Sequence, residues 1–190
     1  MPKLEGALRE LPDEEWEPKP LICDNNLLAA SQGHFDHVID RLLASKVTDI
    51  DFNQGLDARL MTEHHARRIA ELHQAGQLKV ARLAWDWIEM ESDFRRAYNL
   101  LRDAGLPARR ISVYVLIGYK DTPEDALYRL STIWDDLKSW PFPMRYQPLD
   151  AQERDGYVAE NWTDKELKRY TRYWSRLIHF SAIPFDKFTG

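Results

Sequence analysis

The chain alternates short apolar runs with segments whose apolar residues recur at helical spacing. Runs rich in Leu, Ile and Val, each followed by polar residues or glycine, predict strands. The predicted strands are 20–23, 49–53, 78–84, 111–117 and 143–148. The segments between them have the period of amphipathic helices that cover one face of a sheet. Strands that alternate with helices predict an α/β fold with a parallel sheet and right-handed crossovers.

Hydroxyl residues at the starts of these amphipathic segments predict where the helices begin. A side-chain oxygen at the N-cap accepts a hydrogen bond from a backbone N–H of the first turn. The predicted caps are Thr62, Ser92, Thr122 and Thr163. Thr122 is followed by proline and two acids, and Thr163 stands three residues before Glu166, the capping-box spacing.

Composition places the chain among ordinary globular proteins. Its 190 residues fit one domain, and a net charge of −5 gives no electrostatic case for binding nucleic acid or an anionic membrane. The basic pairs 67–68, 95–96, 109–110 and 168–169 are interpreted as solvated faces. There is no long apolar run and no signal-peptide pattern, so we expect a cytoplasmic protein without a membrane partner.

The expected organisation has three parts: an irregular N-terminal segment at 1–19, a β/α unit at 20–150, and a C-terminal helix with its tail at 151–190. The single cysteine excludes an internal disulfide and a four-cysteine zinc site, and we expect no metal site.

Polar side chains gather where the predicted strands end, and the densest group surrounds Gly55. The carboxyl ends of parallel strands share one edge of a sheet, where α/β proteins bind ligands. The residues are Asp24, Asn25, Asn53, Gln54, Asp57, Arg59, Asp86, Lys120, Arg145 and Gln147. Taken singly, Asp and Asn are also the usual residues with which loops begin. Taken together, they predict a polar ligand pocket.

Several short motifs in a consistent order resemble the radical S-adenosylmethionine (SAM) superfamily, in an uncharacterised bacterial and phage branch. The motifs are 24–26 (DNN), 51–59 (DFNQGLDAR), 84–86 (AWD) and 113–119 (VYVLIGY), within a similarity from Lys3 to Leu149. The resemblance implies a TIM-like partial (β/α) barrel. In the full-length family, three cysteines spaced C-x₃-C-x₂-C hold a [4Fe–4S] cluster, the cluster binds SAM, and the enzyme generates a 5′-deoxyadenosyl radical.

The chain departs from that family at the cluster motif. It has only Cys23, on a predicted strand, and one thiolate cannot hold a cluster. We expect a core that lacks the first barrel strand and the cluster loop, through an internal or misassigned start or a shortened gene. On that expectation the chain is inactive alone and binds neither SAM nor the cluster, although the full-length family uses both.

The resemblance also implies roles for individual residues. Asp24, Asn25 and Asn26 stand where many members hold the amino group of SAM, Gly118 where the backbone approaches the adenine, and Tyr146 and Gln147 near that base. The residues left to contact a substrate are Asn53, Gln54, Asp57, Arg59, Asp86 and Lys120. The pattern names no catalytic residue.

Three classes of function stay open. The first is a radical SAM enzyme without its cluster segment, acting on an unknown small or macromolecular substrate. The second is a non-catalytic remnant that binds a ligand or a partner protein. The third is a barrel hydrolase or lyase with Asp51, Asp57 and Asp86 as acid/base groups, which two carboxylates in one pocket would favour. An unpaired sheet edge would also favour a homodimer.

Overall fold

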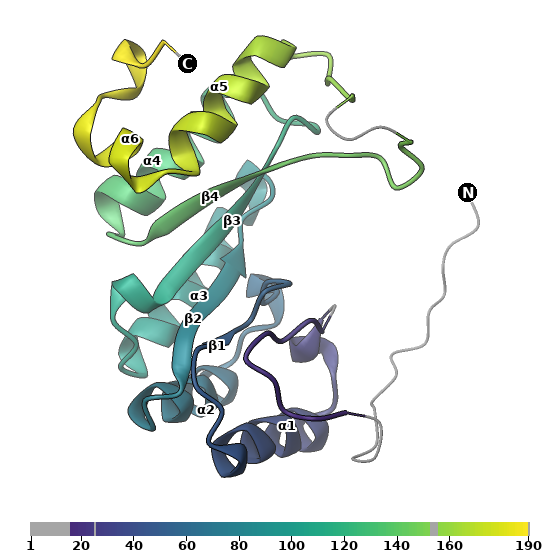
Figure 1. Cartoon of the computed structure of the whole chain (residues 1–190), viewed down its shortest axis with the longest axis vertical. Coiled ribbons are helices and arrows are strands. Elements are labelled where there is room, and N and C mark those ends of the chain that lie inside the picture. Colours follow the sequence, from purple (N-terminus) through teal and green to yellow (C-terminus); the bar gives the residue numbers. More distant parts are fainter. Residues whose placement is uncertain (1–15, 25, 153–155, 190) are drawn as a thin grey trace.

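A four-stranded, all-parallel sheet forms the centre of the molecule in a computed structural model that describes residues 16–24, 26–152 and 156–189. The strands are β1 (Ile50–Asp51), β2 (Leu78–Ala84), β3 (Ile111–Ile117) and β4 (Trp140–Arg145). They lie in the order β1-β2-β3-β4, and each pair of neighbours is parallel (Figure 1). The predicted α/β class with a parallel sheet is confirmed, and the arrangement is compatible with a partial β/α barrel.

The helices follow the strands in alternation. They are α1 (Gln32–Ser45), α2 (Glu63–Gln74), α3 (Glu91–Asp103), α4 (Pro123–Ser131), α5 (Asp164–Trp174) and α6 (Leu177–Ala182). Right-handed crossovers between strands that are neighbours in both sequence and space put the connecting helices on one face of the sheet. Figure 1 shows α2 and α3 behind the strands. This arrangement of the connecting helices is compatible with a partial β/α barrel.

The segment predicted as the first strand runs beside β1 without forming a regular strand. Leu21 makes an isolated parallel bridge to Asp51. The Ile22 N–H donates to the Asp51 carbonyl at 2.9 Å, and the Asp51 N–H donates to the Pro20 carbonyl at 2.8 Å. The parallel pairing predicted for the sheet therefore extends to this segment, although only one residue of it forms a bridge.

The last strand begins and ends earlier than predicted, at 140–145 instead of 143–148. It contains Pro141 and Pro143; the predicted strand began at Pro143 and did not include Pro141. The Tyr146 N–H donates to the Ile117 carbonyl of β3 at 2.8 Å. Because backbone N–H groups alternate in direction along a strand, every second N–H before Tyr146 also points toward β3. Both prolines then face the outer edge, where a missing N–H costs no ladder hydrogen bond.

Three of the four predicted helix caps are confirmed. The Thr62 side chain accepts from the His65 N–H, and Thr122 and Thr163 each form a capping box. The prediction for Ser92 is wrong: α3 begins at Glu91, directly after a 3₁₀ turn (Ile88–Met90), and no side chain caps it. The 3₁₀ turn continues into the helix, which removes the need for a capping hydroxyl.

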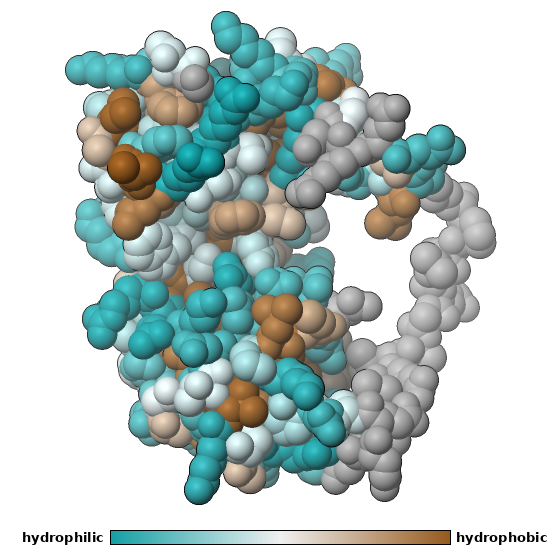
Figure 2. Space-filling view, in the orientation of Figure 1, coloured by the Kyte–Doolittle hydropathy of each residue, from teal (hydrophilic) through white to brown (hydrophobic). Residues whose placement is uncertain are grey.

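The core lies between the sheet and its helices, with Trp85 stacked on Phe94 at 4.5 Å between ring centroids. A π-helical turn (Thr132–Asp136) follows α4 and brings Trp134 to 4.8 Å from Phe180 of α6. On the outside, α6 exposes Leu177 and Ile178, the latter to 71%. Figure 2 shows hydrophobic surface in this upper-left region, which carries α6, and a hollow between the part with α5 and the part with α1.

The predicted N-terminal segment falls mostly outside the described residues, which begin at Trp16, and residues 16–19 form no helix or strand. Among the described residues, the helices are all too short or too polar to cross a membrane.

Candidate functional site

One cavity at the carboxyl ends of β1 and β2 brings together much of the predicted site. Its volume is about 260 Å³. It is lined by Asn26, Gln54, Gly55, Asp57, Arg59, Ala84, Asp86 and Met90. Four of the six residues predicted to contact a substrate are in this set, together with Asn26 from the predicted SAM group. They come from three separate parts of the chain.

Asp57 and Arg59 enter the cavity as a preformed ion pair. Asp57 caps the 3₁₀ turn η3 (Ala58–Leu60) by accepting from the Arg59 N–H at 3.1 Å. The Arg59 guanidinium also binds the Asp57 carboxylate in a bidentate ion pair, with Nε 2.9 Å from Oδ1 and Nη2 2.7 Å from Oδ2. These hydrogen bonds from Arg59 lower the pKa of Asp57, and the Asn26 amide adds a smaller effect. Asp57 is therefore a fixed anion whose charge Arg59 neutralises.

Arg96 of α3 supports the turn that carries this pair. Its Nη1 donates to the Met61 carbonyl at 2.6 Å, and its Nη2 donates to the carbonyls of Ala58 and Arg59 at 3.2 and 3.1 Å. Arg96 is nevertheless exposed, with 44% of its side chain accessible, which agrees with its interpretation as part of a solvated face. Backbone carbonyls at the end of a turn need donors, and a guanidinium fork supplies several at once.

Asp86 follows β2 and differs from Asp57 in its electrostatics. Burial raises the pKa of Asp86, and the positive charges of Arg129 and Arg59 oppose that rise. No described residue donates a hydrogen bond to its carboxyl oxygens. The cavity thus contains the Asp57 carboxylate, which is paired with Arg59, and the half-buried Asp86 carboxyl, which has no hydrogen-bond donor among the described residues. The pKa of Asp57 is lowered and that of Asp86 is raised.

Arg129 of α4 fixes the backbone on which Asp86 stands. The side chain is 0% exposed. Its Nη1 donates to the carbonyls of Trp85, Asp86 and Leu116 at 2.9, 2.7 and 3.1 Å, which ties the end of β2 to β3. Its Nη2 donates to Asp121 Oδ2 at 2.6 Å. Breaking a buried pair of this kind costs about 3–5 kcal/mol, because it leaves the other charge uncompensated.

Asp121 continues this network toward the C-terminal helices. Its Oδ1 accepts from the N–H groups of Gly118 and Tyr119 at 2.9 and 3.2 Å, and from the Trp162 indole at 3.1 Å. The loops after β2 and β3 and the entrance to α5 are therefore held by two buried side chains of opposite charge.

The expected SAM-binding group is only partly supported by its surroundings. Asp24 Oδ1 accepts from the backbone N–H of Asn26 at 2.8 Å, so this carboxylate closes its own turn. Asn25 lies outside the described residues. The role expected for Gly118 stays a prediction: its φ is +76°, and a Cβ there would meet Leu167 Cδ2 of α5 at 2.7 Å. Leu167 therefore fills the space on the side of Gly118 where a Cβ would lie.

The residues predicted after β3 and β4 form a separate aromatic group and do not line this cavity. Tyr146 packs on Tyr119 at 4.5 Å and edge-on to Tyr157 at 5.2 Å. Lys120 Nζ lies 5.3 Å from the Tyr119 ring. Gln147 is half-buried, and Arg145 bonds Asp164 Oδ1 at 3.0 Å.

Two other predicted residues have structural partners. The backbone carbonyl of Asn53 accepts from the Tyr114 hydroxyl at 2.9 Å. Asp51 is buried and receives a bidentate ion pair from Arg82, with Nε 2.6 Å from Oδ1 and Nη2 2.7 Å from Oδ2. Asp51 does not line the cavity, so its proposed acid/base role is corrected: both carboxylate oxygens are already occupied by a cation.

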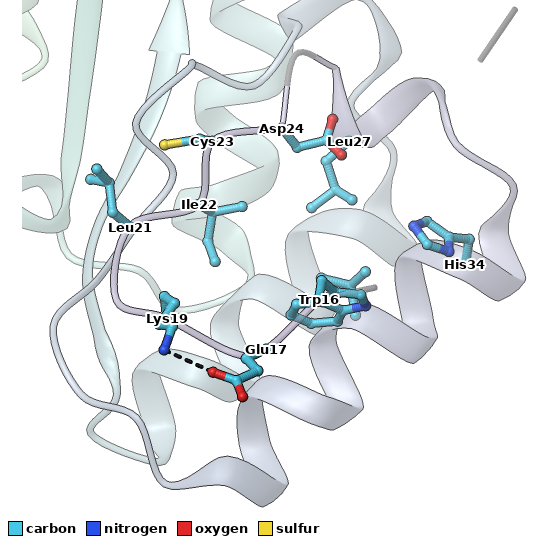
Figure 3. Close-up of a pocket in the computed structure, with 10 residues that line it drawn as sticks. Trp16, Glu17, Lys19, Leu21, Ile22, Cys23, Asp24, Leu27 and His34 are labelled. Atoms are coloured by element: carbon cyan, nitrogen blue, oxygen red, sulfur yellow. Dashed lines mark hydrogen bonds and ion pairs between the residues drawn. The ribbon is translucent and has the colours of Figure 1, made fainter. Parts of the chain in front are cut away.

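A second cavity of about 250 Å³ lies between the segment 16–24 and α1 (Figure 3). Leu21, Ile22, Leu27 and Val38 give it an apolar lining, and Cys23 and His34 stand at its borders. Cys23 is an exposed free thiol. The described residues contain no group of three or more His, Cys, Asp or Glu side chains that could hold a metal ion. A [4Fe–4S] cluster does not fit this chain, because its one cysteine supplies one thiolate.

The residues that support the site were not predicted from the sequence, whereas most of the charged residues that line it were. Arg96, Asp121 and Arg129 act through bonds to backbone carbonyls and amides of distant loops. One signal was available for Arg129: it stands between Leu127 and Leu130 on the apolar side of its helix, where an unpaired arginine is costly.

Comparison with known proteins gives no relative for this chain: no protein-family model, curated protein or solved structure matches it.

Proposed function

We propose that this chain is the ligand-binding part of a barrel of the radical SAM type, and that it binds a small polar molecule in the cavity at the ends of β1 and β2. One observation carries the proposal. Asn26, Gln54, Asp57, Arg59 and Asp86 come from three strand-end segments and line the same cavity. Parallel strands bring their carboxyl ends to one edge in any case, and the support for a site is that these five side chains line one cavity there.

The sheet supports the same proposal at a coarser level. Its strands are parallel and sequential, with β1 flanked by the 20–22 segment, which agrees with a run of consecutive barrel strands. In such a winding the carboxyl ends of the strands form the ligand-binding edge. The part of the barrel described here would orient a ligand, and radical chemistry would need cluster ligands that its single cysteine does not supply.

SAM is the first probe to use, because the full-length family binds it; with this proposal we revise the expectation that this chain alone binds no SAM. The cavity is slightly smaller than the roughly 300–1,000 Å³ typical of sites for drug-sized ligands. It would therefore hold only part of SAM. Met90 lines the cavity and Met144 of β4 does not, so the methyl signals of ¹³C-labelled methionine give a site reporter and an internal control.

We expect titration with SAM to shift the Met90 methyl signal and leave Met144 unchanged. Ala84→Leu places a larger side chain in the cavity and should abolish the shift. Ala75→Leu, at an exposed position after α2, is the matched control and should behave as the unmodified chain. No Met90 response to SAM, or an equal response in Ala84→Leu, would contradict SAM binding at this site.

A second function is favoured by one specific feature, the pair Asp57 and Asp86. Two carboxyls in one cavity with pKa values shifted in opposite directions are the arrangement that separates a general acid from an anion. We propose a hydrolase or lyase with Asp86 as proton donor as the alternative, without Asp51. A bell-shaped pH–rate profile with a turnover substrate, lost in Asp86→Asn, would favour it over binding alone.

A further inference from the structure

The cavity at the ends of β1 and β2 has hydrogen-bond acceptors without donors. The Asp86 carboxyl accepts no hydrogen bond from a described residue. The Asn26 Oδ1 atom is buried and likewise has no partner among the described residues. A buried acceptor such as Asn26 Oδ1 costs free energy when it has no donor. A ligand that brings N–H groups would recover that cost.

The charges of the lining residues point the same way. Arg59 is the only cationic side chain of the cavity lining, and its Nε and Nη2 are both committed to Asp57. That pair is neutral, so the ionised Asp86 leaves the lining with one uncompensated negative charge. Behind the cavity, Arg129 faces the Asp86 backbone and directs its Nη2 to Asp121.

The remaining lining is suited to a carbon chain. Ala84 and the buried side chain of Met90 are apolar, and Gly55 has no side chain to occupy space. With a volume of about 260 Å³, the cavity can enclose a charged head group and a few carbon atoms.

We propose that the cavity binds the primary ammonium group of its ligand, with the Asp86 carboxylate as the counter-ion and the apolar lining around the adjoining carbons. This inference rests on the proposed function and names the chemical class of the ligand. Because burial raises the pKa of Asp86, an ammonium ligand binds more tightly as the pH rises through that value, and binding releases protons. The charges that face Asp86 are those of Arg129, Arg59 and Asp57, and all are present at neutral pH.

Three four-carbon probes that differ only in their head group test the proposal: butylamine, 1-butanol and butyrate. We expect only butylamine to shift the Met90 methyl signal. In Asp86→Asn its affinity should fall about 30-fold or more, as when one partner of a buried charge pair is lost. In Arg59→Gln it should rise about two- to fivefold, because a nearby positive charge is removed and Asp57 is freed. Asp103→Asn, on the exposed end of α3, is the control and should bind as the unmodified chain.

The outcomes separate this inference from the proposed function. If butanol or butyrate shifts Met90 as strongly as butylamine, or if Arg59→Gln weakens butylamine binding, the ammonium class is wrong while the cavity remains a ligand site. If SAM shifts Met90 equally in the unmodified chain and in Asp86→Asn, and butylamine does not shift it, the ammonium class again fails and the proposed function stands. If Met90 responds to no probe, both fail.

Discussion

Asp86 lies in an environment that disfavours its ionised form, because burial raises its pKa. It is half-buried beside a cavity, its backbone carbonyl is fixed by Arg129, and its carboxyl has no hydrogen-bond donor among the described residues. Nothing in its folded surroundings requires an aspartate for stability. A side chain that is poor for the fold and well placed for a ligand is a common sign of function.

The pH dependence of stability should show this effect of burial. The folded pKa of Asp86 lies above its ordinary value of 3.8, so its stabilising contribution is present below that value and is lost as the pH rises through the folded pKa. We expect Asp86→Asn to raise the free energy of unfolding at pH 7 by up to about 1 kcal/mol, with a smaller gain at pH 4.5. Urea unfolding at the two pH values measures it, with Asp103→Asn as the control. Destabilisation by Asp86→Asn at pH 7 would contradict the argument.

At the scale of elements, local sequence patterns predicted the strands with a clear apolar run and the helices with a capping residue. β2 and β3 have the predicted bounds, and Thr62, Thr122 and Thr163 cap helices as predicted. The predicted bounds of β4 were wrong, and α6 was not predicted as a separate helix. β4 depends on having only one neighbouring strand, which makes its two prolines tolerable, and that is not a local property.

Gly118 gives a prediction at this scale, because it sits where β3, its following loop and α5 meet. Gly118 and Gly76 have similar φ values, +76° and +73°, but a Cβ at Gly76 has nothing within 4 Å. Gly76→Ala should therefore cost only the left-handed backbone penalty, about 1–2 kcal/mol. Gly118→Ala should cost about 1–3 kcal/mol more, from overlap with Leu167.

Thermal or urea unfolding of the two variants measures the difference. Adding Leu167→Ala to Gly118→Ala should cost less than Leu167→Ala alone, since the overlap disappears. Equal destabilisation by the two glycine substitutions would show that α5 shifts freely, and the close packing inferred here would be wrong.

At the scale of the whole molecule, the two edges of the sheet differ. Pro141 and Pro143 remove donors from the outer side of β4, which makes pairing there unfavourable. At the other edge, Pro20 and Ile22 bond to Asp51 of β1, so the backbone of Leu21 faces outward, and its side chain is 51% exposed.

We therefore expect a homodimer to form through the Leu21 edge. Light scattering should give twice the mass of the chain at high protein concentration. Leu21→Pro removes only an outward N–H and should give a monomer. A monomer at all concentrations in the unmodified chain, or a dimer that Leu21→Pro leaves intact, would exclude this edge as the interface.

The candidate site could be predicted in part. The sequence predicted that polar residues gather at the strand ends. Four of them line one cavity in the structure: Gln54, Asp57, Arg59 and Asp86. The sequence could not show that Asp51, unlike these residues, is part of a structural ion pair, because its partner Arg82 lies on the neighbouring strand. The filling of the space beside Gly118 depends on α5, a helix more than 40 residues away in the chain.

The sequence by itself determined the alternation of strands and helices, the parallel sheet and the edge at which polar residues gather. These follow from hydrophobic period, capping residues and chain direction, which act over a few residues. Only the tertiary structure decided which polar residues meet, which carboxylates already have a cation, and that Arg129 ties the ends of β2 and β3 together. Those outcomes depend on contacts between residues far apart in the chain, because the free energy of a charged side chain is set by whatever the fold places beside it.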